Sequence, residues 1–507
     1  MQDDLRRAIA ARLQAFQLDH TVERIWSRDH TVWKPDPTEL SNRLGWLNVA
    51  SELAAEVLQL EAFAAAARAE GLDQVLLLGM GGSSLGPEVI RETYGLGTGV
   101  VAFEVLDSTH PDQIRETEAR LDLARTLVVV ASKSGSTIET MSQFAYFWDK
   151  IQAGPQFVAI TDSGSSLEAL GRDHGFREVF LNRADIGGRF SVLSHFGMVP
   201  AALLGAPLTE LLSQGMAMAA RCGPDGPLKE NPGVLLGVAL GEAALAGRDK
   251  CTLRLPDEYS SLGCWVEQLV AESTGKEGRG ILPVESEDEW PANEYGYDRI
   301  FVGYRPESGL EDAGQPVVTL DAAGLGGEFF RWEFATAVAG AILGVQPFDQ
   351  PNVQEAKDVA GKILGGDAPT VSPASFKTVM DTVNAGDYIA INAFVPRNPA
   401  NIRRLEAARN LLGRRYGVAT TLGFGPRFLH STGQLHKGGP NSGVFIEVVE
   451  PADRDLAIPE KPYTFGTLIE AQALGDLAAL LGHGRRACRV TGVDELERLA
   501  ADEDLQD

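Results

Sequence analysis

Two short segments of the chain combine glycines with hydroxyl side chains, and each follows a run of apolar residues. The first is GMGGSSLGP at residues 79–87, which contains Gly82 and Ser83. The second is SKSGST, whose polar members are Ser132, Lys133, Ser134, Ser136 and Thr137. Glycines let the backbone approach a ligand closely, and hydroxyl and backbone N–H groups at a helix start can bind an anion. We expect the second segment to bind phosphate, with a simple helix cap as the alternative.

Neither segment fits the common nucleotide-binding patterns. The dinucleotide fingerprint G-x-G-x-x-G requires an acidic residue about 20 positions further on, whereas residues 79–87 have an extra adjacent glycine and two hydroxyls. SKSGST lacks the spaced glycines and the Gly-Lys-Ser/Thr end of a P-loop. We therefore expect no nucleotide cofactor, and no cofactor of another kind.

Buried strands are expected to position both segments. The apolar runs at 75–78, 126–131 and 157–160 are typical of strands that are buried on both faces, and helical stretches separate them. This alternation favours a doubly wound parallel sheet. Further candidate strands lie at 253–255, 300–304, 317–320, 388–395, 444–449 and 486–490.

The chain is therefore expected to be an α/β protein with two doubly wound parallel-sheet domains, at residues 71–220 and 221–365. A helical segment at 1–70 precedes them, and an α/β extension at 366–507 follows. The stretch IWSRDHTVWKPDPTEL (25–40) breaks the helical pattern with two prolines and two tryptophans, and we expect it to wrap over a core. The acidic end, DELERLAADEDLQD (494–507), is expected to be a solvated tail.

The charge balance limits the partners. The chain has 507 residues with 45 Lys+Arg against 70 Asp+Glu, a formal net charge of −25, so a uniformly basic nucleic-acid surface is excluded. Because this charge repels phosphate esters at long range, local donors must capture an anionic ligand. No run of about 18 apolar residues predicts a membrane span. Four cysteines without C-x-x-C spacing, and histidines without ligand spacing, predict no disulfide framework, no metal site and a cytoplasmic protein.

The two segments together resemble the sugar isomerase (SIS) domain, and three further motifs resemble those of the glucose-6-phosphate isomerase family. These motifs are DIGGRFS at 185–191, QLVAESTGK at 268–276 and PFDQPNVQEAK at 347–357. All five motifs occur in family order. IWSRDHTVWKPDP (25–37) and FLHSTGQLHKGG (428–439) look closest to the isomerase half of fused transaldolase/glucose-6-phosphate isomerase proteins. We expect two SIS-type domains and no transaldolase activity.

The resemblance implies a role for each motif residue. Glu272 matches the base that moves a proton between C1 and C2 of the sugar. Arg189 would stabilise the charge of the enediolate, although a structural salt bridge is the alternative. Lys357 matches the lysine that acts at the ring oxygen and O5, or it is a purely electrostatic group. Gln268 and Gln350 would hold sugar hydroxyls, unless they are helix-end residues.

The histidine that usually helps the family to open the sugar ring is missing. It normally lies between the glutamate and lysine motifs, often supplied by the neighbouring subunit, but no histidine occurs here between His195 and His430. Lys357 alone, a water molecule or a C-terminal histidine could take its place. Our candidates are His430 and His436, whose imidazoles titrate near neutrality; packing within the C-terminal unit is the alternative.

The implied function is the reversible interconversion of D-glucose 6-phosphate and D-fructose 6-phosphate through a cis-enediol(ate), in glycolysis and gluconeogenesis. A dual phosphoglucose/phosphomannose isomerase is one alternative. A non-catalytic SIS module that senses sugar phosphates is another, but it would need the phosphate loop and not Glu272, Arg189 and Lys357 together. The family resemblance also implies a homodimer with a sugar-phosphate substrate.

Overall fold

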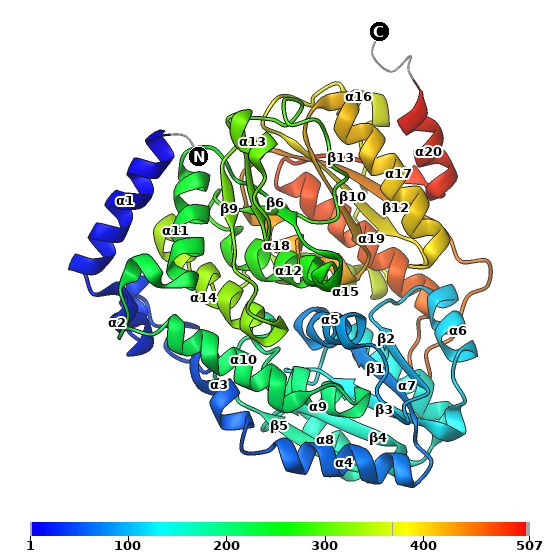
Figure 1. The fold of residues 1–507 in the computed structure, drawn as a ribbon. Coiled ribbons are helices and arrows are strands. Elements are labelled where there is room, and N and C mark those ends of the chain that lie inside the picture. Colours follow the sequence, from blue (N-terminus) through cyan, green and yellow to red (C-terminus); the bar gives the residue numbers. More distant parts are fainter. Residues whose placement is uncertain (1–2, 368, 503–507) are drawn as a thin grey trace.

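The computed structural model describes residues 3–367 and 369–502, and in this part of the chain the strands form three parallel sheets (Figure 1). The sheets occupy successive stretches of sequence. Each one is flanked by helices, so the expected α/β class with parallel sheets is confirmed. The domain boundaries expected near residues 70, 220 and 365 stay a prediction.

The first sheet has the strand order β2-β1-β3-β4-β5. Its strands are β1 (Gln74–Gly79), β2 (Ala102–Leu106), β3 (Thr126–Ala131), β4 (Phe157–Asp162) and β5 (Glu178–Asn182). Its helices are α5 (Leu85–Tyr94), α6 (Pro111–Ala119), α7 (Ile138–Ile151) and α8 (Ser166–Asp173). The order reverses between β1 and β3, and ligands of open α/β sheets bind at the carboxyl ends of strands at such a reversal. The glycine-rich segment after β1 and SKSGST after β3 both leave the sheet at this point.

The second sheet has the order β7-β6-β8-β9. Its strands are β6 (Lys250–Arg254), β7 (Leu282–Val284), β8 (Arg299–Gly303) and β9 (Val317–Thr319). The helices from residue 195 to 364 are α9 (His195–Leu204), α10 (Leu208–Arg221), α11 (Pro232–Leu245), α12 (Leu262–Thr274), α13 (Ser308–Asp312), α14 (Leu325–Leu343) and α15 (Val353–Leu364). The apolar helix α14 packs against α10, α11 and α12, which makes it the centre of the largest core.

The third sheet has the order β11-β10-β12-β13 and a core of its own. Its strands are β10 (Tyr388–Phe394), β11 (Ala419–Phe424), β12 (Gly443–Val449) and β13 (Arg486–Thr491). Its helices are α16 (Phe376–Met380), α17 (Pro399–Tyr416), α18 (Gly433–Gly438), α19 (Phe465–Gly482) and α20 (Gly492–Ala501). Helix α19 packs along α15, and its Phe465 and Leu468 join the apolar cluster beneath the first sheet. The C-terminal unit is thereby held against both of the others.

The N-terminal segment is helical, as expected, and consists of α1 (Asp3–Leu18), α2 (Thr21–Trp26), α3 (Trp46–Leu53) and α4 (Val57–Ala69). The interrupting stretch at 25–40 wraps over the core as expected. Trp33 Nε1 donates to the Ala337 carbonyl of α14 at 2.8 Å, and the Trp33 ring meets Phe348 edge-on. Helices α3 and α4 then run along the outer side of the first sheet (Figure 1).

The expected acidic tail is wrong for residues 494–501. These residues belong to α20, whose Leu496 and Ala500 are buried against the third sheet; the apolar residues recur at helical spacing between the acids, so one face of the segment is covered. Residues 503–507 lie outside the described residues.

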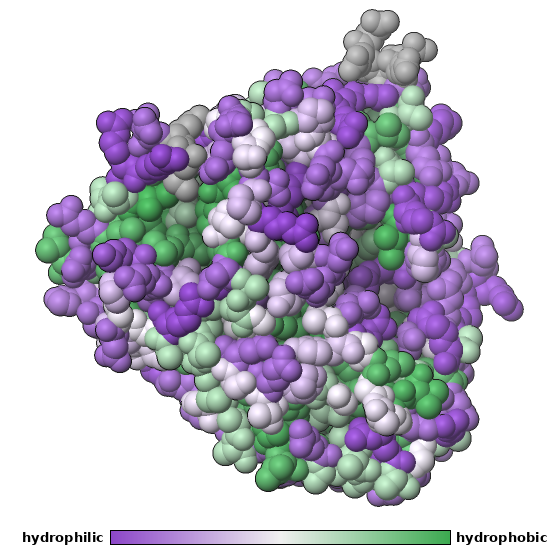
Figure 2. Space-filling model, viewed as in Figure 1, coloured by the Kyte–Doolittle hydropathy of each residue, from purple (hydrophilic) through white to green (hydrophobic). Residues whose placement is uncertain are grey.

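The surface is mostly polar in the view of Figure 2, with an apolar area beside α1 and α11. In the described part of the chain, no helix combines the length and the apolar character that crossing a bilayer requires.

Candidate active site

The glycine-rich segment after β1 lies against two other segments at very close range. Its 3-10 helix η2 (Gly81–Ser83) packs on η5 (Gly188–Phe190) of the DIGGRFS motif. A Cβ atom on Gly82 would lie 2.0 Å from the Gly188 carbonyl oxygen. A Cβ atom on Gly81, whose φ is 55°, would lie 2.7 Å from Gln268 Nε2. Glycine is required at both positions because no other residue allows this approach.

Arg189 is buried, and its guanidinium joins three segments of the chain. Nε donates to Ser273 Oγ of α12 at 2.8 Å. Nη1 donates to Gln350 Oε1 at 3.0 Å. Nη2 donates to the carbonyls of Pro347 at 2.7 Å and Asp349 at 2.9 Å. These bonds bring the DIGGRFS, QLVAESTGK and PFDQPNVQEAK motifs together.

Glu272 lies near the end of α12 with only 8% of its surface exposed. Its two carboxylate oxygens have different partners. Arg189 Nη1 lies 3.1 Å from Oε1, and Gln268 Nε2 donates to Oε2 at 3.2 Å. Gln268 and Glu272 are four residues apart, which places them on the same face of the helix. The arrangement gives a buried carboxylate beside a cation, which can accept a proton in a water-poor site and leave charge stabilisation to Arg189.

His430 lies beside this carboxylate, in the 3-10 helix η8 (Arg427–His430). Its backbone carbonyl accepts a hydrogen bond from Gln268 Nε2 at 2.6 Å, the same amide group that reaches Glu272. Its imidazole Nε2 lies 3.0 Å from Glu139 Oε1 of α7. The charge of His430 and its hydrogen bond, with a smaller contribution from Lys357, outweigh burial and lower the pKa of Glu139. The imidazole is therefore paired with an ionised carboxylate.

His436 lies elsewhere. It is buried in α18, and its ring packs among those of Tyr388, Phe428 and Phe445. Among the described residues, neither ring nitrogen has a hydrogen-bond partner. Burial, and then the Lys437 charge, lower the pKa of His436 well below its ordinary value. Of the two predicted histidines, only His430 lies among the other predicted site residues.

The SKSGST segment forms a compact turn before α7. Ser132 Oγ lies 2.9 Å from Thr137 Oγ1 and accepts the Gly135 N–H at 3.1 Å. Ser134 and Ser136 are exposed. In the described chain the Thr137 side chain makes no capping bond to α7, so the first-turn N–H groups remain open to an anion. Because α7 also carries Glu139, this turn lies next to His430.

The two predicted lysines differ from expectation in their surroundings. Lys133 forms an ion pair with Asp162 at the end of β4 and donates to the Ala184 carbonyl, so its charge is already neutralised. Lys357 is exposed on α15. Its charge makes a small contribution to the lowered pKa of Glu139.

Several residues of the site were not predicted from the sequence. Gln472 of α19 donates to Glu139 Oε1 at 2.7 Å, and Lys276 lies 2.7 Å from Asp349 Oδ1. Lys276 and Asp349 stand inside two of the motifs, so those motifs already pointed to them. Glu139 and Gln472 are 333 positions apart, and no local pattern relates two such residues.

Comparisons with known proteins find glucose-6-phosphate isomerases among the similar sequences. Residues 57–281 match the family model for phosphoglucose isomerase, and this range contains four of the five motifs. A probable glucose-6-phosphate isomerase of Methanococcus maripaludis is 26% identical over 386 residues, 65% of this chain and 86% of the relative. Chloroplastic glucose-6-phosphate isomerase 1 of Arabidopsis thaliana is 35% identical over 213 residues, 40% of this chain and 35% of the relative.

Solved structures share the fold. The crystal structure of a hypothetical protein from Thermus thermophilus matches with a TM-score of 0.61 at 23% identity, covering 72% of this chain and 99% of that one. A glucose-6-phosphate isomerase from Chlamydia trachomatis matches with a TM-score of 0.51 at 24% identity, covering 68% and 78%. The nearer resemblance to fused transaldolase proteins stays a prediction. The resemblance to the glucose-6-phosphate isomerase family that the five motifs predict is confirmed by the family model over residues 57–281 and by these relatives.

Proposed function

We propose that this chain is a glucose-6-phosphate isomerase, which interconverts D-glucose 6-phosphate and D-fructose 6-phosphate. The observation that carries the proposal is the buried Glu272 carboxylate, held between Arg189 and Gln268. A carboxylate in this setting can take the proton from C2 of the aldose and return it to C1. The cis-enediolate formed between these steps is negatively charged, and Arg189 stabilises that charge where it develops. A module that only senses sugar phosphates would not require the Glu272–Arg189 pair.

The phosphate of the substrate is assigned to the SKSGST turn. The exposed hydroxyls of Ser134 and Ser136 and the open N-terminus of α7 supply donors. Positive helix-dipole ends and free N–H groups favour an anion at this position. Because Lys133 is paired with Asp162, these neutral donors carry most of the binding.

Ring opening is assigned to His430, with Lys357 as a further cation. Glu139 orients the imidazole through Nε2, and Gln472 in turn holds Glu139. Such a chain of hydrogen bonds fixes the orientation of the imidazole ring. His430 can then exchange a proton with the ring oxygen while Glu272 works at C1 and C2. The cytoplasmic homodimer implied by the family resemblance is part of this proposal, and light scattering of the purified chain would test the dimer.

Lys276 is assigned a positioning role under Arg189. Its Nζ pairs with the Asp349 carboxylate and donates to the Gln346 carbonyl, while the Asp349 carbonyl accepts from Arg189. Burial, and then the Arg189 charge, lower the pKa of Lys276 from 10.5 to about 7. Asp349, which accepts a hydrogen bond from Arg189, is therefore also paired with a lysine whose pKa lies near neutrality.

The general base is tested by Glu272→Gln. This change keeps the shape of the side chain and removes the proton acceptor, so we expect kcat to fall by about 10²–10⁴-fold with near-normal binding of a sugar phosphate. Glu277→Gln, which alters a carboxylate on the surface paired with Lys34, is the matched control. Wild-type turnover in Glu272→Gln would reject the assignment.

The phosphate turn is tested by Ser134→Ala and Thr137→Ala. Losing a hydroxyl that bonds a charged group costs about 1.5–3 kcal/mol, so KM for fructose 6-phosphate should rise roughly 10- to 100-fold and inhibition by inorganic phosphate should weaken. Ser213→Ala, an exposed serine of α10, serves as the control. If KM and phosphate inhibition stay unchanged in both variants, the turn does not bind the phosphate and only caps the helix.

The ring-opening assignment is tested by comparing His430→Ala with His436→Phe. We expect His430→Ala to lose turnover of the cyclic sugar phosphate while it retains proton exchange with the open-chain form. His436→Phe preserves a ring among Tyr388, Phe428 and Phe445 and should affect neither reaction. Full cyclic-substrate turnover in His430→Ala would leave Lys357 or water as the ring-opening group.

The Lys276 assignment is tested by the pH dependence of stability. Between pH 7 and about 10.5 the unfolded chain holds a proton on Lys276 that the folded chain lacks, so the stability of the wild type rises with pH through this group. Lys276→Met lacks this effect. The free energy of unfolding in urea, wild type minus Lys276→Met, should therefore grow by about 1.4 kcal/mol per pH unit above pH 7. A difference that is equal at pH 7.5 and pH 9 would contradict the lowered pKa.

A further inference from the structure

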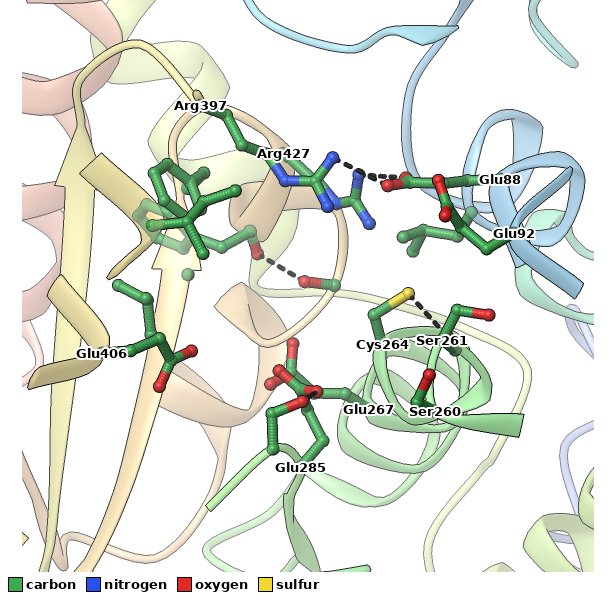
Figure 3. Close-up of a pocket in the computed structure, with 18 residues that line it drawn as sticks. Glu88, Glu92, Ser260, Ser261, Cys264, Glu267, Glu285, Arg397, Glu406 and Arg427 are labelled. Atoms are coloured by element: carbon green, nitrogen blue, oxygen red, sulfur yellow. Dashed lines mark hydrogen bonds and ion pairs between the residues drawn. The ribbon is translucent and has the colours of Figure 1, made fainter. Parts of the chain in front are cut away.

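A cavity of about 360 Å³ lies between the three sheet-bearing units (Figure 3). Its walls come from α5, the first half of α12, the residues after β7, α17, β11 and η8. The rim residues Glu92, Ser260 and Ser286 are exposed, whereas Glu267 and Arg427 are buried. The cavity therefore leads from solvent into the junction of the units, and the isomerase chemistry proposed above makes no use of it.

The two cations of the cavity are already neutralised. Arg427 lies 2.8 Å from Asp107 Oδ2 and also forms an ion pair with Glu88. Arg397 Nη1 lies 2.7 Å from Glu88 Oε1. Figure 3 shows both guanidiniums together with Glu88 on one side of the cavity. An anionic ligand would have to compete with these carboxylates.

Three carboxyl groups, Glu267, Glu285 and Glu406, lie on the other side of the cavity (Figure 3). The Glu285 charge acts on both Glu267 and Glu406, and Glu406 acts on Glu267, so all three interact. Arg409 contacts Glu406 at 3.3 Å, and its charge and that of Arg427 both act on Glu267. Because Arg427 is already paired with Glu88 and Asp107, the three carboxyl groups share little compensating charge.

Glu267 is the side chain that requires a ligand. It is 8% exposed and its carboxylate lines the cavity. Within residues 3–367 and 369–502 its carboxylate has no hydrogen-bond or ion-pair partner, and Arg409 and Arg427 act on it only through their charge. A buried carboxylate without a partner costs free energy, and here burial, followed by the Glu285 charge, raises the pKa of Glu267 to about 8.

The spacing of the carboxylates favours an organic cation over a metal ion. Among the described residues, no three His, Cys, Asp or Glu side chains are close enough together to hold a metal. An alkylammonium group donates three hydrogen bonds and can reach carboxylates that are further apart. The cavity has room for a small organic molecule, since ligand pockets start at about 300 Å³.

We propose that this cavity binds a small organic cation with a primary ammonium group, which Glu267, Glu285 and Glu406 accept. A ligand in this place contacts α12 and η8, the two segments that hold Gln268 and His430. The net charge of the protein, −25, also concentrates cations near its surface at low salt. The site is separate from the sugar-phosphate site and does not depend on the isomerase assignment.

The test is isothermal titration calorimetry of the full chain with 1,4-diaminobutane in 100 mM KCl, which screens non-specific attraction. We expect one saturable site in the wild type and no binding of the uncharged analogue 1,4-butanediol. Glu267→Gln and Glu406→Gln, on different helices, should each weaken diamine binding at least tenfold. Glu61→Gln removes the same charge from an exposed position of α4 and should bind like the wild type.

Three outcomes would overturn the proposal. These are the absence of a saturable site in the wild type, equal binding by the wild type and both cavity variants, and binding of MgCl₂ that Glu267→Gln removes. Circular dichroism of each variant checks that it is folded. Since Glu267 and Glu406 lie on separate helices, one folded variant is sufficient to decide.

Discussion

The buried guanidinium of Arg189 is the interaction on which the site depends. A charge of this kind costs several kcal/mol to bury unless it is paired and its N–H groups are satisfied. Here Ser273, Gln350 and the carbonyls after α14 accept its hydrogen bonds, and Glu272 neutralises it. These partners come from two separate motifs and Arg189 from a third, so the need to satisfy one guanidinium fixes the positions of all three. The Gly82–Gly188 contact then fixes the first loop against them.

Helix α12 serves two surfaces at once. Gln268 and Glu272 are four residues apart and face the proposed sugar site, whereas Cys264 and Glu267 are three apart and line the cavity. Cys264 and Gln268 are themselves four apart, so the two pairs occupy adjoining sectors of the helix surface. The short helix η8 also contributes to both sites, with Arg427 in the cavity and His430 at the proposed sugar site. The two sites therefore adjoin each other across shared elements, and both include residues of the C-terminal unit.

The sequence predicts the interior of each sheet better than its edges. Strands β1, β3, β4 and β10 are continuous apolar runs because they are buried on both faces. The strands that escaped prediction, β2, β5, β7 and β11, all lie at sheet edges. They have charged residues, a proline or threonines where an inner strand has aliphatic ones. The motifs identified Glu272 and Arg189, but nothing local related Glu139 to His430 or separated His430 from His436, because tertiary packing decides both.

A chain with a net charge of −25 must still bind a dianionic substrate under the proposed function. Screening resolves this conflict, because at physiological ionic strength charges beyond about 8 Å contribute little. Only nearby groups then act on the phosphate. Asp162 neutralises the charge of Lys133, so the hydrogen-bond donors for the phosphate are the hydroxyls and the N–H groups at the start of α7. Such a site holds phosphate by several directed hydrogen bonds instead of one strong ion pair. For a reversible isomerisation this has a consequence: the phosphate is held alike in both sugars, so the turn contributes equal binding to each and leaves the discrimination between ground state and enediolate to Arg189 and Glu272.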